Sequence, residues 1–177
     1  MPKIWNALSQ PINLPEINSY TEKDNFFTYG SFNNFQKISS ETIKTWSKIL
    51  KDGNAKLILK SSTSFDEKNL NKFLINKFKK ENIGEDKIEI LSRKKTYFEH
   101  LESYNKIDLS LDTFPYPGVT TSFESVSMGT PVLTMKGFNF NSRCGESINK
   151  NLNLENFIAS NEDDYIDKAL TIKKENK

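Results

Sequence analysis

The feature that most constrains this chain is a regular alternation of short apolar segments with longer segments of helical periodicity. The apolar segments span 26–31, 55–60, 87–91, 107–111, 131–135 and 156–159. The sequence predicts helices over 41–50, from a cap at Ser64 or Asp66 to about 80, and over 97–104, 120–128, 141–150 and 162–172. Strands that alternate with helices form parallel βαβ units. We therefore expect an α/β fold, a Rossmann-like doubly wound parallel sheet.

The length of 177 residues suits one domain with a substantial core. Residues 1–24 carry Pro2, Pro11 and Pro15 among polar residues, which is typical of an extended arm or linker. The regular pattern begins at residue 25. We expect an N-terminal arm over 1–24 and a single domain over 25–177.

Composition narrows the classes of partner and the compartment. The chain has 25 Lys and Arg against 23 Asp and Glu, so its net charge of +2 gives no support for general binding to nucleic acid or to a membrane surface. One cysteine, Cys144, allows no intrachain disulfide and favours a reducing compartment. The first ten residues lack the pattern of a signal peptide, and no run approaches the ~18 apolar residues that span a bilayer. We expect a cytoplasmic protein.

The most informative loop is segment 111–121, which leaves a predicted strand and enters a predicted helix. Ligands of doubly wound sheets bind at such carboxyl ends of strands. Gly118 allows close approach of the backbone, and Thr120 and Thr121 put hydroxyls beside the free N–H groups of a helix start, which suits a diphosphate. On spacing alone, ordinary capping is favoured, because Thr121 and Glu124 form a T-x-x-E capping box. Glu124 would then either cap the helix or accept hydrogen bonds from ribose hydroxyls.

Other polar candidates have plain alternatives. The segment 30–37 ends in Lys37, which could neutralise a phosphate or could be solvated in a turn, and the turn is favoured. His100 is the sole histidine; a lone histidine is more often structural, and with one cysteine it makes a zinc site unlikely. The cluster 93–95 is basic, with a surface role as the default and a phosphate contact as the alternative. We expect no metal.

Several catalytic motifs are absent from the sequence. No G-x-G-x-x-G follows the first predicted strand, which argues against a dinucleotide oxidoreductase. No G-x-x-x-x-G-K-[ST] is present, which argues against a P-loop nucleotidase. A Ser–His–Asp hydrolase is not excluded by residue counts, but there is no G-x-S-x-G. A receiver-like signalling domain needs an acidic pair after its first strand, and this chain has Ser31, Phe32 and Asn33 there.

Three strings and one pair of residues resemble the C-terminal catalytic lobe of the protein O-GlcNAc transferase and SPINDLY glycosyltransferase family. They are GSFNNFQKI (30–38), HLESYNKIDLSLDTFPYPGVTTSFESVSMGTPVLTMKG (100–137), NLENFIASNEDDYIDKAL (153–170), and Ser142 with Arg143. The resemblance implies a two-lobed GT-B architecture. It also implies inverting, metal-independent transfer of a sugar from a nucleotide to Ser or Thr hydroxyls of proteins, without a cofactor.

The resemblance also implies roles for individual residues. Asn34 would match the family's amide, and Lys37 the lysine that binds phosphate and stabilises the leaving group. His100 would match the residue near the nucleobase, and Glu124 the acidic residue on the ribose. Gly118 and Val119 lead into Thr120 and Thr121, the threonines that would bind the diphosphate.

The sequence departs from the family's animal enzymes at two of these places. Val119 stands where they carry a histidine, and Tyr97 where they carry a basic residue. SPINDLY-like members, which the strings GSFNN (30–34) and TFPYPG (113–118) resemble more closely, use GDP-fucose; UDP-GlcNAc is the other candidate donor.

The family's superhelical repeats and N-terminal catalytic lobe have no counterpart in these 177 residues. We therefore expect a nucleotide-sugar-binding lobe that transfers poorly alone, with a protein acceptor and a separate N-terminal lobe as partners. The alternative is a non-catalytic lobe that binds a nucleotide or a partner. A sugar-nucleotide epimerase shares the two-lobed fold and would also need the other half.

Overall fold

A computed structural model describes residues 9, 13–17, 26–60 and 67–175. Its centre is a six-stranded parallel sheet in the order β3-β2-β1-β4-β5-β6. The strands are β1 (Phe27–Ser31), β2 (Ala55–Lys60), β3 (Ile88–Leu91), β4 (Leu109–Leu111), β5 (Val132–Met135) and β6 (Ile158–Ala159). The predicted α/β class and doubly wound sheet are confirmed, because the order runs outward from β1 in both directions.

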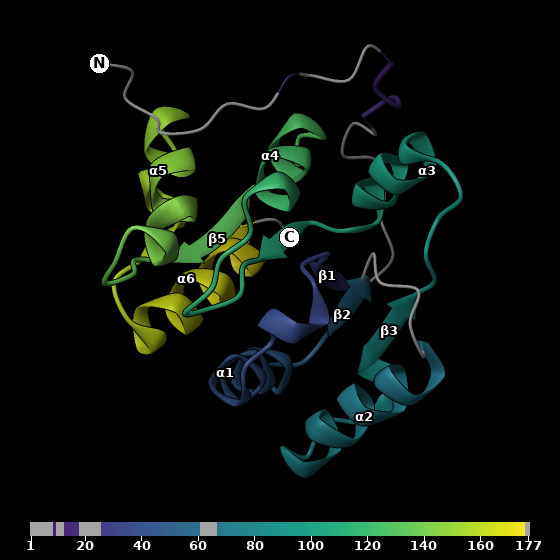
Figure 1. The fold of residues 1–177 in the computed structure, drawn as a ribbon. Coiled ribbons are helices and arrows are strands. Elements are labelled where there is room, and N and C mark those ends of the chain that lie inside the picture. Colours follow the sequence, from purple (N-terminus) through teal and green to yellow (C-terminus); the bar gives the residue numbers. More distant parts are fainter. Residues whose placement is uncertain (1–8, 10–12, 18–25, 61–66, 176–177) are drawn as a thin grey trace.

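Helices cover both faces of the sheet (Figure 1). One face carries α1 (Ser40–Leu50), α2 (Glu67–Lys80) and α6 (Glu162–Glu175), whose apolar residues join the strands in the larger core. The other face carries α3 (Tyr97–Glu102), α4 (Thr120–Ser127) and α5 (Cys144–Asn151). Leu101 of α3 lies in a smaller core on that face. The crossover through α3 takes the chain from the outer strand β3 back to β4, beside β1.

Local sequence explains where α1 begins and how it packs. The Ser39 hydroxyl accepts the Thr42 N–H at 3.0 Å and caps the helix. Ile43, Trp46 and Ile49 recur at helical spacing and are buried against the sheet. The chain then turns back at Gly53, whose φ of 66° is a left-handed value that glycine adopts without strain.

Gly30 lets β1 lie close to the segment that leads into its neighbour β4. A Cβ at this position would lie 2.5 Å from Cγ2 of Ile107 and 2.6 Å from its Cδ1. Ile107 is itself buried in the smaller core. The close approach fixes β1 beside β4, where the strand order reverses, and the loops after these two strands therefore part and leave a crevice.

Most predicted boundaries agree with the structure to within one or two residues. The predicted helix over 97–104 ends earlier, at Glu102, and continues as a 3-10 turn over Ser103–Lys106. The predicted cap at Ser64 or Asp66 lies outside the described residues. Where the structure describes helices, none has the length and apolarity needed to cross a membrane.

The described part of the predicted arm lies against the domain. Leu14 packs on the smaller core, and Pro15 is buried. The Asn105 amide donates to the carbonyl of Glu16 at 2.8 Å. The division of the chain at residue 24 stays a prediction.

Candidate functional site

A cavity of about 540 Å³ opens at the carboxyl edge of the sheet, beside the reversal of strand order. Seven of the eight residues predicted to form a site line it: Asn34, Lys37, His100, Val119, Thr120, Thr121 and Glu124. The eighth, Gly118, is buried directly before Val119. The topology thus brings segments separated by about ninety residues to one place.

Asp112, at the end of β4, ties the loops around this cavity together. Its Oδ1 accepts the Gly118 N–H at 2.6 Å and the Asn33 amide at 3.0 Å. Its Oδ2 accepts the Thr134 hydroxyl at 2.8 Å. Burial raises the pKa of this carboxyl to about 6, against the lowering effect of these donors. One carboxylate therefore fixes the loops after β1 and β4 to the adjoining strand β5.

Asn33 is the second link between these loops, and the sequence reasoning missed it. It is only 5% exposed, and its amide oxygen accepts the Thr121 hydroxyl at 2.5 Å. A Cβ on Gly118 would lie 2.6 Å from the same oxygen, so a side chain there would part the loops. The adjacent Asn34 was the amide predicted from the family; its side-chain oxygen accepts the Gln36 N–H at 3.0 Å.

The predicted capping box at Thr121 and Glu124 is wrong. Helix α4 begins after Val119, which offers no side-chain cap, and Thr121 donates to Asn33 instead. Glu124 turns away from the helix start toward His100. The first N–H groups of α4 therefore have no side-chain cap, and the start of the helix faces the cavity with its positive end.

A capping box does occur one loop earlier. The Thr96 hydroxyl accepts the Glu99 N–H at 3.1 Å, and the Glu99 carboxylate accepts the N–H of Thr96 at 3.1 Å. This box starts α3 and so places His100 one turn into the helix.

His100 and Glu124 meet at the floor of the cavity. His100 Nε2 lies 3.0 Å from Glu124 Oε2, and the Tyr104 hydroxyl donates to the same oxygen at 3.2 Å. Glu124 is 4% exposed, so these donors replace water around a buried carboxylate. Burial, together with the nearby Glu124 carboxylate, raises the pKa of Tyr97 to about 12.

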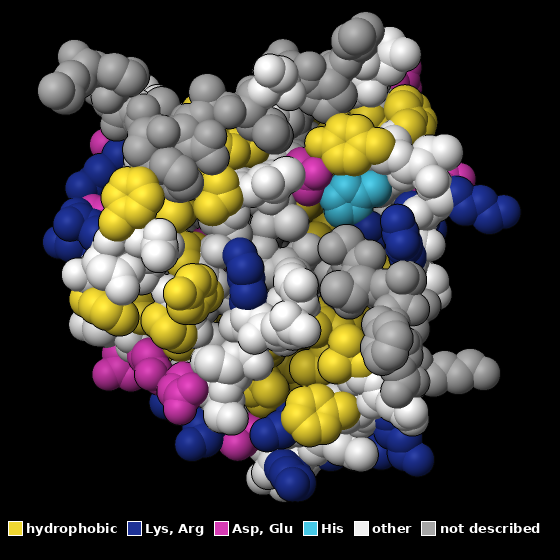
Figure 2. Space-filling view, in the orientation of Figure 1, with side chains coloured by type: hydrophobic (Ala, Val, Ile, Leu, Met, Phe, Trp, Pro, Cys, Tyr) yellow, Lys and Arg dark blue, Asp and Glu magenta, His cyan; other side chains and the backbone are white. Residues whose placement is uncertain are grey.

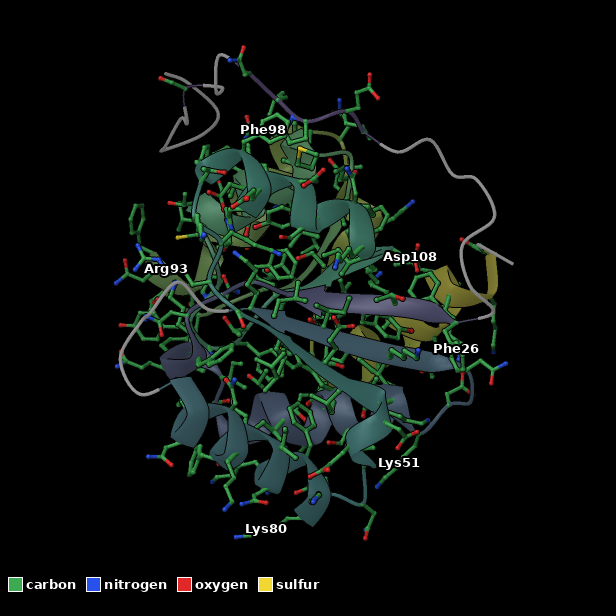
Figure 3. The ribbon with its side chains drawn as sticks, turned by 90° about the vertical axis from the view of Figure 1, so that its right-hand side faces the viewer. Phe26, Lys51, Lys80, Arg93, Phe98 and Asp108 are labelled. Atoms are coloured by element: carbon green, nitrogen blue, oxygen red, sulfur yellow. The ribbon has the colours of Figure 1, made fainter. Side chains whose placement is uncertain are left out.

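The cavity is strongly cationic. Besides Glu124 and His100, its charged lining is basic: Lys37, Lys60, Arg93, Lys94 and Lys95. Lys37 reaches across from the first loop and donates to the Pro117 carbonyl at 2.9 Å. Arg93 lies at the end of the sheet opposite Phe26 and Asp108 (Figure 3). The histidine, coloured cyan in Figure 2, lies beside an acidic side chain and near basic ones. The basic cluster 93–95, whose default interpretation was a surface role, is exposed and also lines the cavity.

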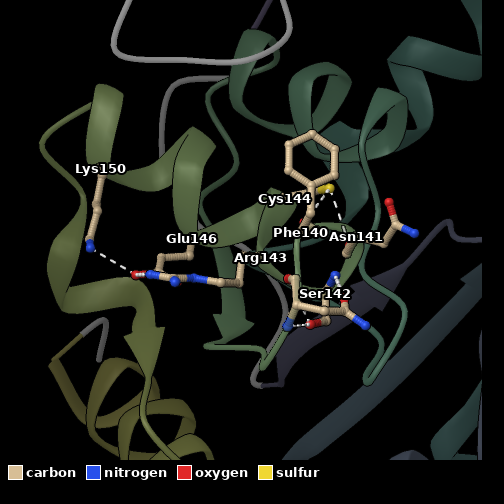
Figure 4. A network of polar contacts seen from close by, with 8 residues as sticks. Phe140, Asn141, Ser142, Arg143, Cys144, Glu146 and Lys150 are labelled. Atoms are coloured by element: carbon tan, nitrogen blue, oxygen red, sulfur yellow. Dashed lines mark hydrogen bonds and ion pairs between the residues drawn. The ribbon is translucent and has the colours of Figure 1, made fainter.

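A separate network follows β5, around the matched pair Ser142 and Arg143 (Figure 4). Glu146 accepts from Arg143 Nε at 2.7 Å and from Lys150 Nζ at 2.7 Å. These bonds, Arg143 foremost, lower the pKa of the 3% exposed Glu146 to about 2. Arg143 and Lys150 thus both pair with Glu146, and these ion pairs stabilise the first turns of α5. Phe138 and Phe140 stand beside them, 83% and 63% exposed.

The described residues contain no group of three or more His, Cys, Asp or Glu that could hold a metal ion. The buried thiol of Cys144 has a pKa raised by desolvation, which disfavours the thiolate that a nucleophile requires. The chemistry that the site offers is therefore anion binding by ammonium, guanidinium and backbone N–H groups, with one carboxylate that can accept hydroxyls.

Comparison with known proteins gives the same family from sequence and from structure. The chain matches the family described as Glycosyl transferase family 41 over residues 6–177. It is 35% identical over 148 residues to the tomato (Solanum lycopersicum) protein named probable UDP-N-acetylglucosamine–peptide N-acetylglucosaminyltransferase SPINDLY. That match covers 83% of this chain and 16% of the tomato protein, so the chain spans about a sixth of the relative's length.

Comparison with solved structures agrees with the comparison of sequences. A mutant O-GlcNAc transferase of Thermobaculum terrenum superposes with a TM-score of 0.84 at 31% identity, over 92% of this chain and 31% of that one. The C-terminal domain of a glycosyl transferase group 1 family protein of Francisella tularensis shares the fold, with a TM-score of 0.51 and 14% identity over 84% and 83% of the two chains. By its sequence and by its fold, this chain belongs to glycosyl transferase family 41.

Proposed function

We propose that this chain is the donor-binding lobe of a transferase that moves a sugar from a nucleoside diphosphate to Ser or Thr hydroxyls of proteins. The observation that carries the proposal is the cavity at the reversal of strand order. It combines five basic side chains and the uncapped start of α4 with a single carboxylate, Glu124. A nucleotide sugar has the matching parts, a diphosphate and a ribose diol.

The chemistry of the lining suggests how the donor binds. The diphosphate would lie against the N–H groups of Thr120 and Thr121 and the hydroxyl of Thr120, with Lys37 opposite. The ribose would approach Glu124, a carboxylate suited to accept two vicinal hydroxyls. The nucleobase would then extend toward His100 and Tyr97, whose rings stack with centroids 5.9 Å apart.

The transfer itself would be a direct displacement. The hydroxyl oxygen of the acceptor attacks the anomeric carbon while the bond from that carbon to the diphosphate oxygen breaks. The electron pair leaves with the diphosphate, the configuration inverts, and the hydroxyl proton passes to a base outside this lobe. Lys37 and the start of α4 would stabilise the added negative charge without a metal ion.

The acceptor side of the reaction would belong to another lobe. The chain spans 16% of the tomato relative and 31% of the Thermobaculum structure. We propose a separate N-terminal lobe as its partner. The relatives' names specify UDP-N-acetylglucosamine as donor. The likeness of residues 30–34 and 113–118 to SPINDLY-like members favours GDP-fucose instead, and the two donors differ in both base and sugar.

Calorimetric titration with UDP, GDP, UDP-GlcNAc and GDP-fucose, without added metal, tests the proposal. We expect binding with a preference for one base. Lys37→Ala should weaken that binding by roughly tenfold or more, because it removes a charge-assisted hydrogen bond. Lys44→Ala, an exposed lysine on α1, is the matched control and should bind like the wild type. Absence of binding, or an unchanged affinity of Lys37→Ala, would refute the assignment.

A further inference from the structure

Lys60, the last residue of β2, is a buried ammonium that the family resemblance did not single out. It is 3% exposed and lines the cavity behind His100. No carboxylate among the described residues lies within ion-pair distance of it. Burial lowers its pKa to about 8, an effect that nearby Lys94 increases and Glu124 opposes. Burying an ammonium costs free energy that a methionine at this position would avoid.

The contacts of Lys60 show what compensates this cost. Its Nζ lies against Nδ1 of His100, and it stands 5.6 Å from the centre of the Phe32 ring. An ammonium has only protons to offer, so Nδ1 must be the accepting nitrogen of the imidazole. The ring proton is then on Nε2, the atom that lies 3.0 Å from Glu124 Oε2.

These contacts form one chain from Lys60 through His100 to Glu124. The ammonium and the carboxylate balance each other across the neutral ring, and each end is buried. Tyr104 holds the same carboxylate oxygen from another side. The orientation of Glu124 therefore depends on a ring whose own orientation depends on Lys60.

We propose that Lys60 is a positioning residue of the donor site, which fixes His100 so that its Nε2–H orients Glu124 toward the ribose of a bound nucleotide. The part of this proposal that concerns the ribose rests on the proposed function. The contact between Lys60 and His100 rests on the geometry of the structure alone. Lys60 touches no reacting atom in this scheme.

The test compares Lys60→Met, which keeps the length of the side chain, with Lys60→Arg, which keeps a donor, and with Lys44→Met as surface control. His100 is the sole histidine of the chain, so its ring nitrogens give one set of resonances in the untagged protein. We expect the Nδ1 resonance of the wild type to shift as Lys60 loses its proton around pH 8, with Lys94, His100, Tyr97 and Glu124 as the neighbouring titratable groups. In Lys60→Met, the Nδ1 resonance of His100 should already differ from the wild type at neutral pH, and it should no longer change around pH 8.

The second readout is recognition of the ribose. The wild type, Lys60→Arg and Lys44→Met should bind the preferred diphosphate, UDP or GDP, more tightly than its 2′,3′-dideoxy counterpart. In Lys60→Met, the ratio of the affinity for the ribonucleotide to that for the dideoxy nucleotide should fall most of the way to one, because the affinity for the ribonucleotide is reduced roughly tenfold. Glu124→Gln should lose the ratio as well while it keeps the Nδ1 response. A general packing defect would weaken both nucleotides alike.

An Nδ1 resonance that is the same in Lys60→Met and wild type would overturn the proposal, as would a ribose-to-dideoxy ratio that survives in Lys60→Met. A wild-type protein that binds neither diphosphate would refute the proposed function. The Nδ1 resonance would then decide alone whether Lys60 positions His100.

Discussion

Removal of the Asp112 carboxylate tests whether one buried acceptor holds the site loops together. In Asp112→Ala, three N–H groups lose their acceptor: the backbone N–H of Thr113 and of Gly118, and one amide N–H of Asn33. The Thr134 hydroxyl can turn to another acceptor, so it adds little. At about 1–3 kcal/mol for each buried donor left unpaired, the three donors should cost the variant at least about 3 kcal/mol of unfolding free energy. This is a large fraction of the stability of a typical domain.

Asp112→Asn is the matched control. Its side-chain oxygen can accept the same three N–H groups, and its amide can donate to Thr134, whose hydroxyl also accepts. The change removes only a charge that burial disfavours. We expect Asp112→Asn to be at least as stable as the wild type in urea unfolding at pH 7.5, because it keeps the acceptor and lacks the buried charge.

The two proteins should also differ in their dependence on pH. The pKa of Asp112 is raised from 3.8 to about 6 in the folded state. The folded protein therefore binds this proton more tightly than the unfolded chain does, and the associated stability is complete below pH 3.8 and lost as pH rises through 6. The stability of wild type relative to Asp112→Asn should fall by at most about 3 kcal/mol between pH 4 and pH 7. A constant difference, or an Asp112→Asn as unstable as Asp112→Ala, would refute the reasoning.

Two further predictions concern packing and the second ion network. Gly30→Ala should cost about 1–3 kcal/mol in urea unfolding, because its Cβ would overlap Ile107, and the double variant with Ile107→Ala should be less destabilised than the sum of the single changes; additive costs would locate the strain elsewhere. Glu146, with its pKa lowered to about 2, contributes stability above pH 4.5 that is lost as pH falls toward 2, so the advantage of wild type over Glu146→Gln in thermal melts should shrink across that range; a constant gap would show that Arg143 and Lys150 do not hold the carboxylate.

The fold was predictable because it depends on local periodicity. Apolar runs of four to six residues between amphipathic stretches predict parallel strands wherever they occur, and tertiary packing moved the ends by only one or two residues. The starts of β4 and β6 moved most, by two residues each: Ile107 and Asp108 belong to the predicted run but precede β4. Asp108 instead accepts the backbone N–H of Thr28 with its carboxylate at 2.7 Å.

The site was predictable only where the sequence resembles a known family. Spacing alone favoured a capping box at Thr121 and Glu124. That prediction failed because Thr121 donates to Asn33, which is 88 residues away and which a T-x-x-E pattern cannot reveal. Asn33, Lys60 and Asp112 were missed for the same reason, since their partners are distant in the chain. One signal was available and unused: Thr96 and Glu99 have the same T-x-x-E spacing, and they do form the box.

The position of the basic residues explains how a nearly neutral chain can form a strongly cationic cavity. The net charge is +2, yet five basic side chains line a cavity with one carboxylate. Lys37 follows β1, Lys60 ends β2, and the cluster 93–95 follows β3. In a parallel sheet all of these points lie at the same edge, so the strand order concentrates charges that the sequence spreads over about sixty residues. The cationic cavity is therefore a property of the folded sheet, which the composition of the chain does not reveal.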